Sequence, residues 1–355
     1  MEYRRLGRTG LEISIIGYGG LPLHFQTPEV AIEAIHEALD QGINYFDLDE
    51  GGNQFDPQKV YLDGGSKIGQ VLKEKREDCY LGVKSMRQTY EELKADVDLA
   101  LERIVKGTKR EVIDIFQLAF LDTPKKLEVI LSEKGGLRAL EEAKGEGKID
   151  YILGAAHNPR TLKEVIKSGK FDVVEFPFNI IEDEYLEEVI PLADEMDIGT
   201  IVMKPIGGGQ LRENAHLSLR WILGHPIDTA IPGMKNREEV KRNVVIGHHW
   251  KPLNEKELKT LQKMGEEIGK HYCHRCGYCL PCDQGIMIVG VMDIMLTPFL
   301  SFERKKKIYR EVIIDKFKSD PKNCIRCEQC VEKCPFNLPI PDMMEKAVEM
   351  FGEDP

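Results

Sequence analysis

The sequence predicts an α/β protein: a TIM (β/α)8 barrel over residues 1–252, followed by a small α-helical domain over 253–355. Two observations lead to this expectation. Short β-branched runs alternate with amphipathic stretches across the first part of the chain, which is the pattern of βα units around a parallel sheet. Beyond that part the composition changes, because eight of the nine cysteines fall there.

Eight candidate strands follow one another at the spacing of βα units. They cover residues 14–18, 44–48, 80–84, 113–118, 151–155, 173–176, 200–203 and 228–231. Amphipathic helices fit between them at 28–41, 90–105, 137–145, 161–167, 183–196, 214–223 and 237–245. Eight units within about 250 residues is the size of a TIM barrel. A doubly wound open sheet is the competing fold, but no Gly-x-Gly-x-x-Gly motif opens a first helix.

Charge and hydropathy exclude several classes of partner. The net charge is -11, and no Lys/Arg run has the aromatic interleaving of a nucleic-acid surface. The chain begins with polar residues and lacks the apolar core of a signal peptide, so we expect a cytoplasmic protein. The apolar stretch 286–300 is interrupted by Asp293 and is too short to span a bilayer, so we expect a core segment and no membrane contact.

The cysteines form two runs with regular spacing. The first is Cys273-x2-Cys276-x2-Cys279-x2-Cys282, and the second is Cys324-x2-Cys327-x2-Cys330-x3-Cys334 followed by Pro335. The second run is the bacterial ferredoxin signature, in which three thiolates wrap one [4Fe–4S] cube and the fourth reaches the other. Cys79, apart from both runs, is expected in the barrel core.

By this logic the domain carries two [4Fe–4S] clusters. One would be held by Cys273, Cys276, Cys279 and Cys334, and the other by Cys282, Cys324, Cys327 and Cys330. Structural zinc is the alternative, since four thiolates also suit that ion, but zinc sites pair two C-x2-C knuckles rather than three successive steps. Helical patterns at 297–318 and 341–351 make this an α-helical, dicluster ferredoxin-like domain.

Residues 1 to about 250 also resemble the aldo-keto reductase family. The matching segments are Tyr3-Arg-Arg-Leu-Gly-Arg-Thr-Gly-Leu-Glu-Ile-Ser14, Gly42-Ile-Asn-Tyr-Phe-Asp47, Gly147-Lys-Ile-Asp-Tyr-Ile-Leu-Gly154, Met203-Lys-Pro-Ile-Gly-Gly-Gly209 and Ile231-Pro-Gly-Met234. One branch of the family has a C-terminal ferredoxin-like 4Fe–4S domain. The resemblance implies carbonyl reduction by a nicotinamide, with a Tyr as proton donor, a Lys held by an Asp, and a His that orients the substrate.

Only part of that catalytic set is present. Asp47 and Lys84 match the family's Asp and Lys, and we expect them to form an ion pair. The family's Tyr falls at Gly52, in a rewritten loop where Tyr61 could substitute for it. The family's His falls at Ala119, which has no polar group.

Three further residues should line the mouth of the barrel, where the strands end. His157 stands where the family has an Asn that contacts the nicotinamide amide; it could act as a replacement acid, or be a strand-end histidine with an ordinary hydrogen bond. Asn179 and Lys204 end later strands, and Lys204 could hold an anionic ligand or cofactor.

NAD(P)H binding remains an open expectation. Glu239 stands where the family's Arg grips the 2'-phosphate, and a carboxylate there would repel NADP. Asn243 matches a residue that contacts adenine in the family, and Lys235 and Arg237 could supply charge from nearby.

Three functions remain open at this stage. The first is an iron–sulfur oxidoreductase that couples a small-molecule or nicotinamide site in the barrel to an electron-carrier protein or partner oxidoreductase. The second is an electron-transfer scaffold with a catalytically degenerate barrel. The third is a conventional NAD(P)H-dependent carbonyl reductase. Because a barrel hosts many chemistries, the fold alone does not choose among them.

Overall fold

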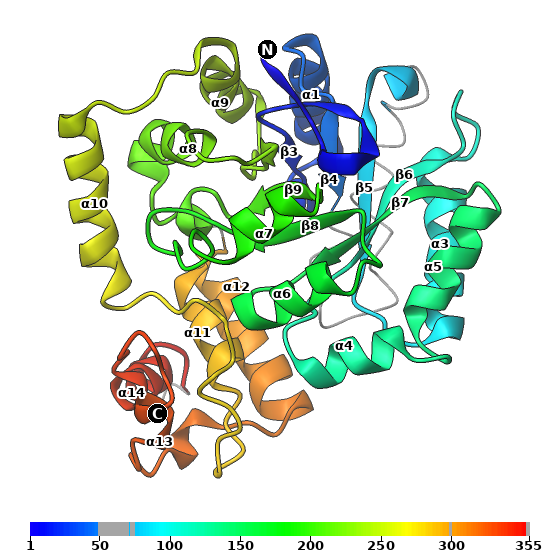
Figure 1. Ribbon diagram of the computed structural model, residues 1–355. Coiled ribbons are helices and arrows are strands. Elements are labelled where there is room, and N and C mark those ends of the chain that lie inside the picture. The colour runs from blue at the N-terminus through cyan, green and yellow to red at the C-terminus, as the bar shows by residue number, and fades with distance from the viewer. Residues whose placement is uncertain (49–70, 72–74, 298–299, 353–355) are drawn as a thin grey trace.

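The computed structural model describes residues 1–48, 71, 75–297 and 300–352, and it confirms the barrel. Eight parallel strands form one sheet in the order β10-β9-β8-β7-β6-β5-β4-β3 (Figure 1). Parallel bridges join Ile16 to Ala230 and Gly19 to Gly233, which link the first strand to the last. The strands are β3 (Tyr18–Gly19), β4 (Tyr45–Leu48), β5 (Tyr80–Ser85), β6 (Ile113–Leu118), β7 (Ile149–Ala155), β8 (Val173–Pro177), β9 (Gly199–Met203) and β10 (Thr229–Ala230).

The first barrel strand begins later than the sequence predicts. Part of the expected strand at 14–18 belongs to a hairpin, in which β1 (Tyr3–Arg5) pairs antiparallel with β2 (Glu12–Ser14). Ser14 pairs with Tyr3, Ile16 forms a bridge to Ala230 of the last strand, and Tyr18 and Gly19 pair with β4. The hairpin brings Leu6 and Ile13 against apolar residues of the barrel interior.

The helices lie outside the sheet and cover it, and the structure also describes α4, which the sequence analysis had not predicted. Helices of the barrel region are α1 (Pro28–Asp40), α3 (Tyr90–Ala100), α4 (Pro124–Leu131), α5 (Gly136–Gly145), α6 (Pro159–Lys167), α7 (Val189–Glu195), α8 (Ala215–Leu223) and α9 (Arg237–His249). Their apolar faces and the strands form one continuous core, which includes Cys79 as expected.

Helix α10 (Glu255–Gly269) begins just beyond the expected domain boundary at residue 252 and packs on the barrel. Leu261 is fully buried in a cluster with Leu211 and Leu217. Arg220 of α8 donates to both carboxylate oxygens of Glu257, at 2.7 and 2.9 Å. These contacts connect the barrel to the segment that carries the cysteines, and the boundary itself stays a prediction.

The C-terminal region is helical, and its helices gather at one end of the barrel (Figure 1). They are α11 (Ile288–Leu296), α12 (Phe302–Ile308), α13 (Gln329–Glu332) and α14 (Ile340–Phe351), and a π-helical stretch (Tyr309–Lys316) continues α12. Val291, Ile313 and Ala347 are fully buried at the centre of a second core. Among the helices that the structure describes, none has the length and apolar character needed to cross a membrane.

The end of the barrel away from the cysteines is stabilised by a buried ion pair. Arg76 Nη2 lies 2.6 Å from Asp114 Oδ2, and both side chains are fully buried. We expect Asp114→Ala to reduce the free energy of unfolding by about 3–5 kcal/mol, because it leaves a guanidinium buried without its partner. Unfolding followed by tryptophan fluorescence reports this, since both tryptophans, Trp221 and Trp250, lie in the barrel region.

The matched control is Asp150→Ala, which removes the partly exposed partner of Arg110. Exposed pairs contribute about 0–1 kcal/mol, so this variant should unfold almost as the wild type does. Equal losses in the two variants would contradict the role given to the buried pair.

Candidate functional site

The strand ends bring together an acidic and a basic group inside the barrel, as the sequence suggests. Lys84 of β5 lies with its Nζ 2.8 Å from Oδ2 of Asp47 on β4. A second carboxylate, which the sequence analysis missed, approaches from across the barrel: Glu175 Oε1 of β8 is 3.6 Å from the same ammonium. The side chain of Glu175 is only 1% exposed. It is the one charged residue of an otherwise apolar strand, and this pattern could have indicated a buried functional carboxylate.

The rest of the family's catalytic set is not found among the described residues at this place. Tyr61 and Gly52 lie outside the part of the chain that the structure describes. Ala119 follows β6, and its backbone N–H donates to Ser85 O at 2.9 Å. Its methyl side chain offers no hydrogen bond to a substrate.

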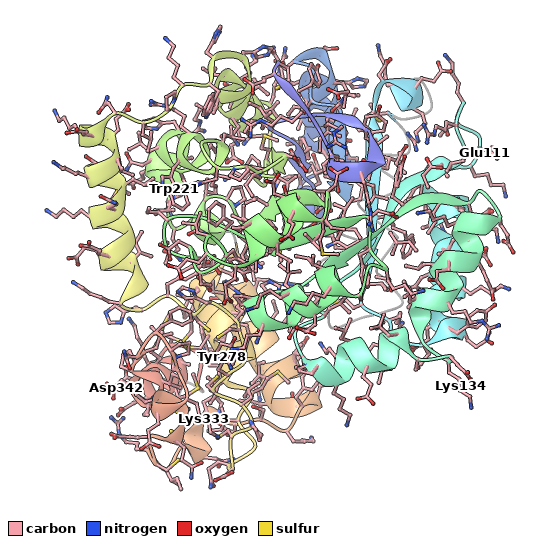
Figure 2. The ribbon with its side chains drawn as sticks, viewed as in Figure 1. Glu111, Lys134, Trp221, Tyr278, Lys333 and Asp342 are labelled. Atoms are coloured by element: carbon pink, nitrogen blue, oxygen red, sulfur yellow. The ribbon has the colours of Figure 1, made fainter. Side chains whose placement is uncertain are left out.

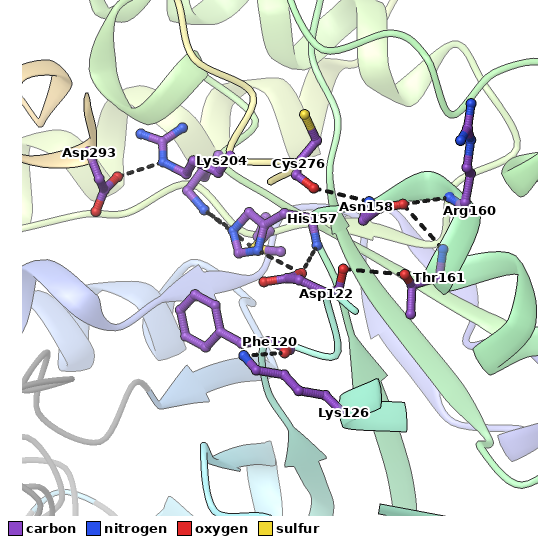
Figure 3. A network of polar contacts seen from close by, with 12 residues as sticks. Phe120, Asp122, Lys126, His157, Asn158, Arg160, Thr161, Lys204, Cys276 and Asp293 are labelled. Atoms are coloured by element: carbon purple, nitrogen blue, oxygen red, sulfur yellow. Dashed lines mark hydrogen bonds and ion pairs between the residues drawn. The ribbon is translucent and has the colours of Figure 1, made fainter. Parts of the chain in front are cut away.

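His157 follows β7 and is the centre of a polar network, shown in Figure 3. Its Nε2 lies 2.6 Å from Lys204 Nζ, and its Nδ1 lies 3.5 Å from Asp122 Oδ1. The ring stacks on Phe120 with centroids 5.3 Å apart. Burial and the nearby Lys204 ammonium lower the pKa of His157, so the imidazole is neutral at neutral pH and its Nε2 accepts a hydrogen bond from Lys204.

Lys204 follows β9 in a backbone conformation that only a few non-glycine residues adopt, with φ at 51°. Asn179 Nδ2 donates to the Lys204 carbonyl at 3.2 Å and to Glu182 Oε2 at 2.8 Å. Burial, and then repulsion by the Arg275 guanidinium, lower the pKa of Lys204 to about 8. Asn179 therefore holds the backbone that presents this lysine.

The segment with the first cysteine run docks on the same network. Asn158, which caps α6 by accepting from the backbone N–H of Arg160 at 3.0 Å, donates through Nδ2 to the Cys276 carbonyl at 3.0 Å. Tyr278 Oη donates to Asn158 Oδ1 at 3.2 Å. Figure 2 shows Tyr278 at the border of the barrel, whereas Lys333 and Asp342 lie farther from it.

Arg275, between two cysteines of the first run, extends this contact into the barrel mouth. Its Nε donates to Asp293 Oδ1 of α11 at 2.5 Å, and its side chain is 9% exposed. Tyr272 Oη donates to Glu182 Oε2 at 3.0 Å. The sequence analysis missed these residues, because their partners are distant along the chain and no local motif marks them.

The ferredoxin spacing predicts two sets of cluster ligands, which we name the inner and the outer cysteine group. The inner cysteine group consists of Cys273, Cys276, Cys279 and Cys334. Burial, followed by the proximity of the other three thiols of the group, raises the pKa of Cys279 to about 12. Cysteines coordinate metals as thiolates. A bound metal would therefore take the place of the thiol proton and offset the repulsion between the neighbouring thiolates.

The outer cysteine group consists of Cys282, Cys324, Cys327 and Cys330. All four line one cavity, together with Cys279 of the inner group. Within the described residues no three His, Cys, Asp or Glu side chains converge as ligands of a single metal ion do. Cys327 is exposed and the neighbouring Ile325 is 64% exposed, whereas Cys273, Cys279 and Cys334 are each 8% exposed.

The segment expected to bind a nicotinamide cofactor places two carboxylates at the start of a helix. Asn236 caps α9 by accepting from Glu239 N at 3.0 Å, and Glu238 and Glu239 occupy the first turn. Glu239 accepts from Lys235 N at 2.9 Å. A helix N-terminus attracts anions, but two carboxylates already occupy this one. Asn243 is buried on the same helix, with 8% of its side chain exposed.

Fold and site together define a barrel oxidoreductase with an appended iron–sulfur module. Residues 15–216 match the aldo/keto reductase family and residues 317–339 match the 4Fe–4S binding domain. The chain belongs to the aldo/keto reductase family, and its C-terminal region contains a 4Fe–4S ferredoxin-type domain. The second match covers Cys324 to Cys334 and does not extend to the first cysteine run.

Individual relatives agree with this assignment. The chain is similar to L-galactose dehydrogenase of Arabidopsis thaliana, 29% identical over 60% of this chain and 68% of the relative. It is also similar to 6-dehydroglucose reductase of Novosphingobium aromaticivorans, 25% identical over 59% and 70%. Among solved structures, the aldo-keto reductase AKR11C1 from Bacillus halodurans in its holo form is similar, with a TM-score of 0.60 and 25% identity over 74% of this chain and 96% of that one.

The docking contact at Asn158 leads to a prediction about the cysteine segment. Asn158→Ala removes the hydrogen bond to the Cys276 carbonyl, so backbone amides of residues 272–280 should exchange hydrogen faster. The variant also loses a helix cap, which costs about 0.5–2 kcal/mol. Hydrogen exchange followed by mass spectrometry measures the segment directly.

Asn236→Ala is the matched control, because Asn236 also caps a barrel helix but, within the part of the chain that the structure describes, forms no hydrogen bond with the cysteine segment. It should leave exchange in residues 272–280 unchanged. If Asn158→Ala also left that segment as protected as in the wild type, the docking role of Asn158 would be wrong.

Proposed function

We propose that this protein is an iron–sulfur oxidoreductase in which the barrel mouth binds a small-molecule substrate and the C-terminal domain carries two [4Fe–4S] clusters. When bound, the clusters would supply or accept single electrons. The observation that carries the proposal is the hydrogen bond from Asn158 at the barrel mouth to the Cys276 carbonyl, at 3.0 Å. It joins the inner cysteine group to the residues beside His157 and Lys204.

The difference in exposure between the two cysteine groups supports a direction for the electron path. In the inner cysteine group Cys273, Cys279 and Cys334 are buried and Cys276 is partly buried, whereas Cys327 of the outer group is exposed. The outer group would therefore face an electron-carrier protein or partner oxidoreductase, and the inner group would face the substrate. Whether electrons run inward or outward depends on the partner's potential.

Metal analysis and spectroscopy test the first part of this proposal. Anaerobically purified protein should contain about eight irons and a matching amount of acid-labile sulfide, about four for each cubane. A substrate of the barrel should bleach or restore the cluster absorbance. Stoichiometric zinc without sulfide would contradict the clusters, and absorbance indifferent to every barrel ligand would favour the scaffold alternative.

Conventional NAD(P)H-dependent carbonyl reduction is a second candidate, because the Asp47–Lys84 pair has the arrangement that the family uses, with 2.8 Å between Nζ and Oδ2. Against it stand Ala119, the carboxylates at the start of α9, and Glu175 beside Lys84. Titration of NADH and NADPH fluorescence decides this point. A saturable change in nicotinamide fluorescence would support a nicotinamide site if Asp47→Asn leaves it intact. Glu239→Arg should then strengthen the binding of NADPH.

A further inference from the structure

Lys204, His157 and Asp122 have the arrangement of a nucleophile, its base and a group that orients the base. We propose that Lys204 is an amine nucleophile that forms an imine with a small aldehyde or ketone at the barrel mouth. This activity is independent of electron transfer by the clusters, and it gives the barrel a carbonyl chemistry that the incomplete Asp47–Lys84 set does not provide.

The amine of Lys204 and the imidazole of His157 are in direct contact. Lys204 Nζ and His157 Nε2 are 2.6 Å apart, within the reach for proton transfer between a nucleophile and a base. Because Nε2 accepts from the lysine, the ring proton lies on Nδ1, which faces Asp122 Oδ1 at 3.5 Å. An imidazolium formed by proton uptake would then be stabilised by that carboxylate.

The position of the imidazole is fixed from three directions. The His157 backbone N–H donates to Asp122 Oδ1 at 2.6 Å, and Tyr185 Oη donates to the His157 carbonyl at 2.9 Å. Phe120 stacks on the ring with an interplanar angle of 20°. Asp122 therefore holds the backbone of this histidine by a hydrogen bond, and its Oδ1 lies at ion-pair distance, 3.5 Å, from the ring Nδ1.

The lysine itself is held in an uncommon backbone conformation. Its φ of 51° is unfavourable for a residue other than glycine, and such backbone strain concentrates at functional sites. Hydrogen bonds from Asn179 Nδ2 at 3.2 Å and from the Gly207 backbone N–H at 2.9 Å to the Lys204 carbonyl maintain it. Lys204 is half-buried, so part of the residue remains accessible to solvent.

The charge environment favours the neutral amine that attack on a carbonyl requires. Burial and the Arg275 guanidinium lower the pKa of Lys204 to about 8. About one-tenth of the lysine is then a free amine at pH 7, against well under one-thousandth for an ordinary lysine. A desolvated lysine beside another cation is a recurring form of Schiff-base lysine.

The proposed step balances without an added oxidant or reductant. The Lys204 nitrogen adds to the carbonyl carbon, and the carbonyl oxygen takes up a proton to give a carbinolamine. Loss of water, with proton transfers that His157 can mediate, leaves a carbon–nitrogen double bond. The net change is amine plus carbonyl to imine plus water.

Borohydride trapping tests the proposal on the full-length, cluster-loaded protein kept oxidised and anaerobic. The protein is incubated at pH 7 with pyruvate or dihydroxyacetone and then reduced, and mass spectrometry counts adducts at each lysine. We expect Lys204 to be labelled on the order of 10²-fold more than the exposed Lys235. Lys84 should stay unlabelled, because Asp47 and Glu175 hold its ammonium.

This comparison is made within one wild-type chain, so it does not depend on a variant that folds. His157→Gln should slow labelling of Lys204 by about 10²-fold, whereas His225→Gln, a change at a histidine that packs on Trp221, should leave it unchanged. Labelling of Lys204 no greater than that of Lys235 with both probes would overturn the proposal. Cluster bleaching is measured separately, so this failure and failure of the proposed oxidoreductase function are distinguishable.

Discussion

The contact between Asn158 and the Cys276 carbonyl, 3.0 Å long, is the constraint on which the arrangement of the two halves depends. Asn158 has two roles, because its oxygen caps α6 and its nitrogen binds the cysteine segment. Helix α6 begins two residues after His157, which follows β7. The same residue therefore fixes the start of a barrel helix and the distance between the barrel mouth and the inner cysteine group.

Charge balance explains how so many ionisable groups can be buried at this junction. The cations Lys204 and Arg275 lie among the carboxylates Asp122, Glu182 and Asp293, which come from the barrel and from α11. Buried charges are tolerated when they are paired. Neither half of the chain supplies the complete set, so the network forms only when the C-terminal region lies on the barrel.

Sequence patterns predict the location of a residue when that location follows from its position in a repeating βα unit or a cysteine motif. Asp47, Lys84 and His157 could be placed because they end strands whose order follows from the βα pattern. The ferredoxin spacing relates Cys334 to the first run, and the two cysteine groups that follow from it stay a prediction. Each of these predictions combines a local sequence pattern with a general rule for how such patterns are arranged in the fold.

The missed residues depend on contacts between distant segments. Arg275 and Asp122 look like ordinary loop residues until the cysteine segment lies on the barrel, and Glu175 acquires its role only by crossing the barrel to Lys84. The shortened first strand has a similar cause, because pairing with Tyr3–Arg5 removes Ser14 from the barrel. No local periodicity encodes these partners.

The claim that the two halves build one site is tested most directly by the reduction potentials of the proposed clusters. Potentiometric titration followed by electron paramagnetic resonance would compare the wild type with Lys204→Met, with Arg326→Met near the outer cysteine group as control. Loss of a buried positive charge disfavours an added electron. The account predicts that Lys204→Met lowers the potential of one cluster only, and that Arg326→Met leaves that cluster unchanged; identical potentials in Lys204→Met and wild type would contradict it.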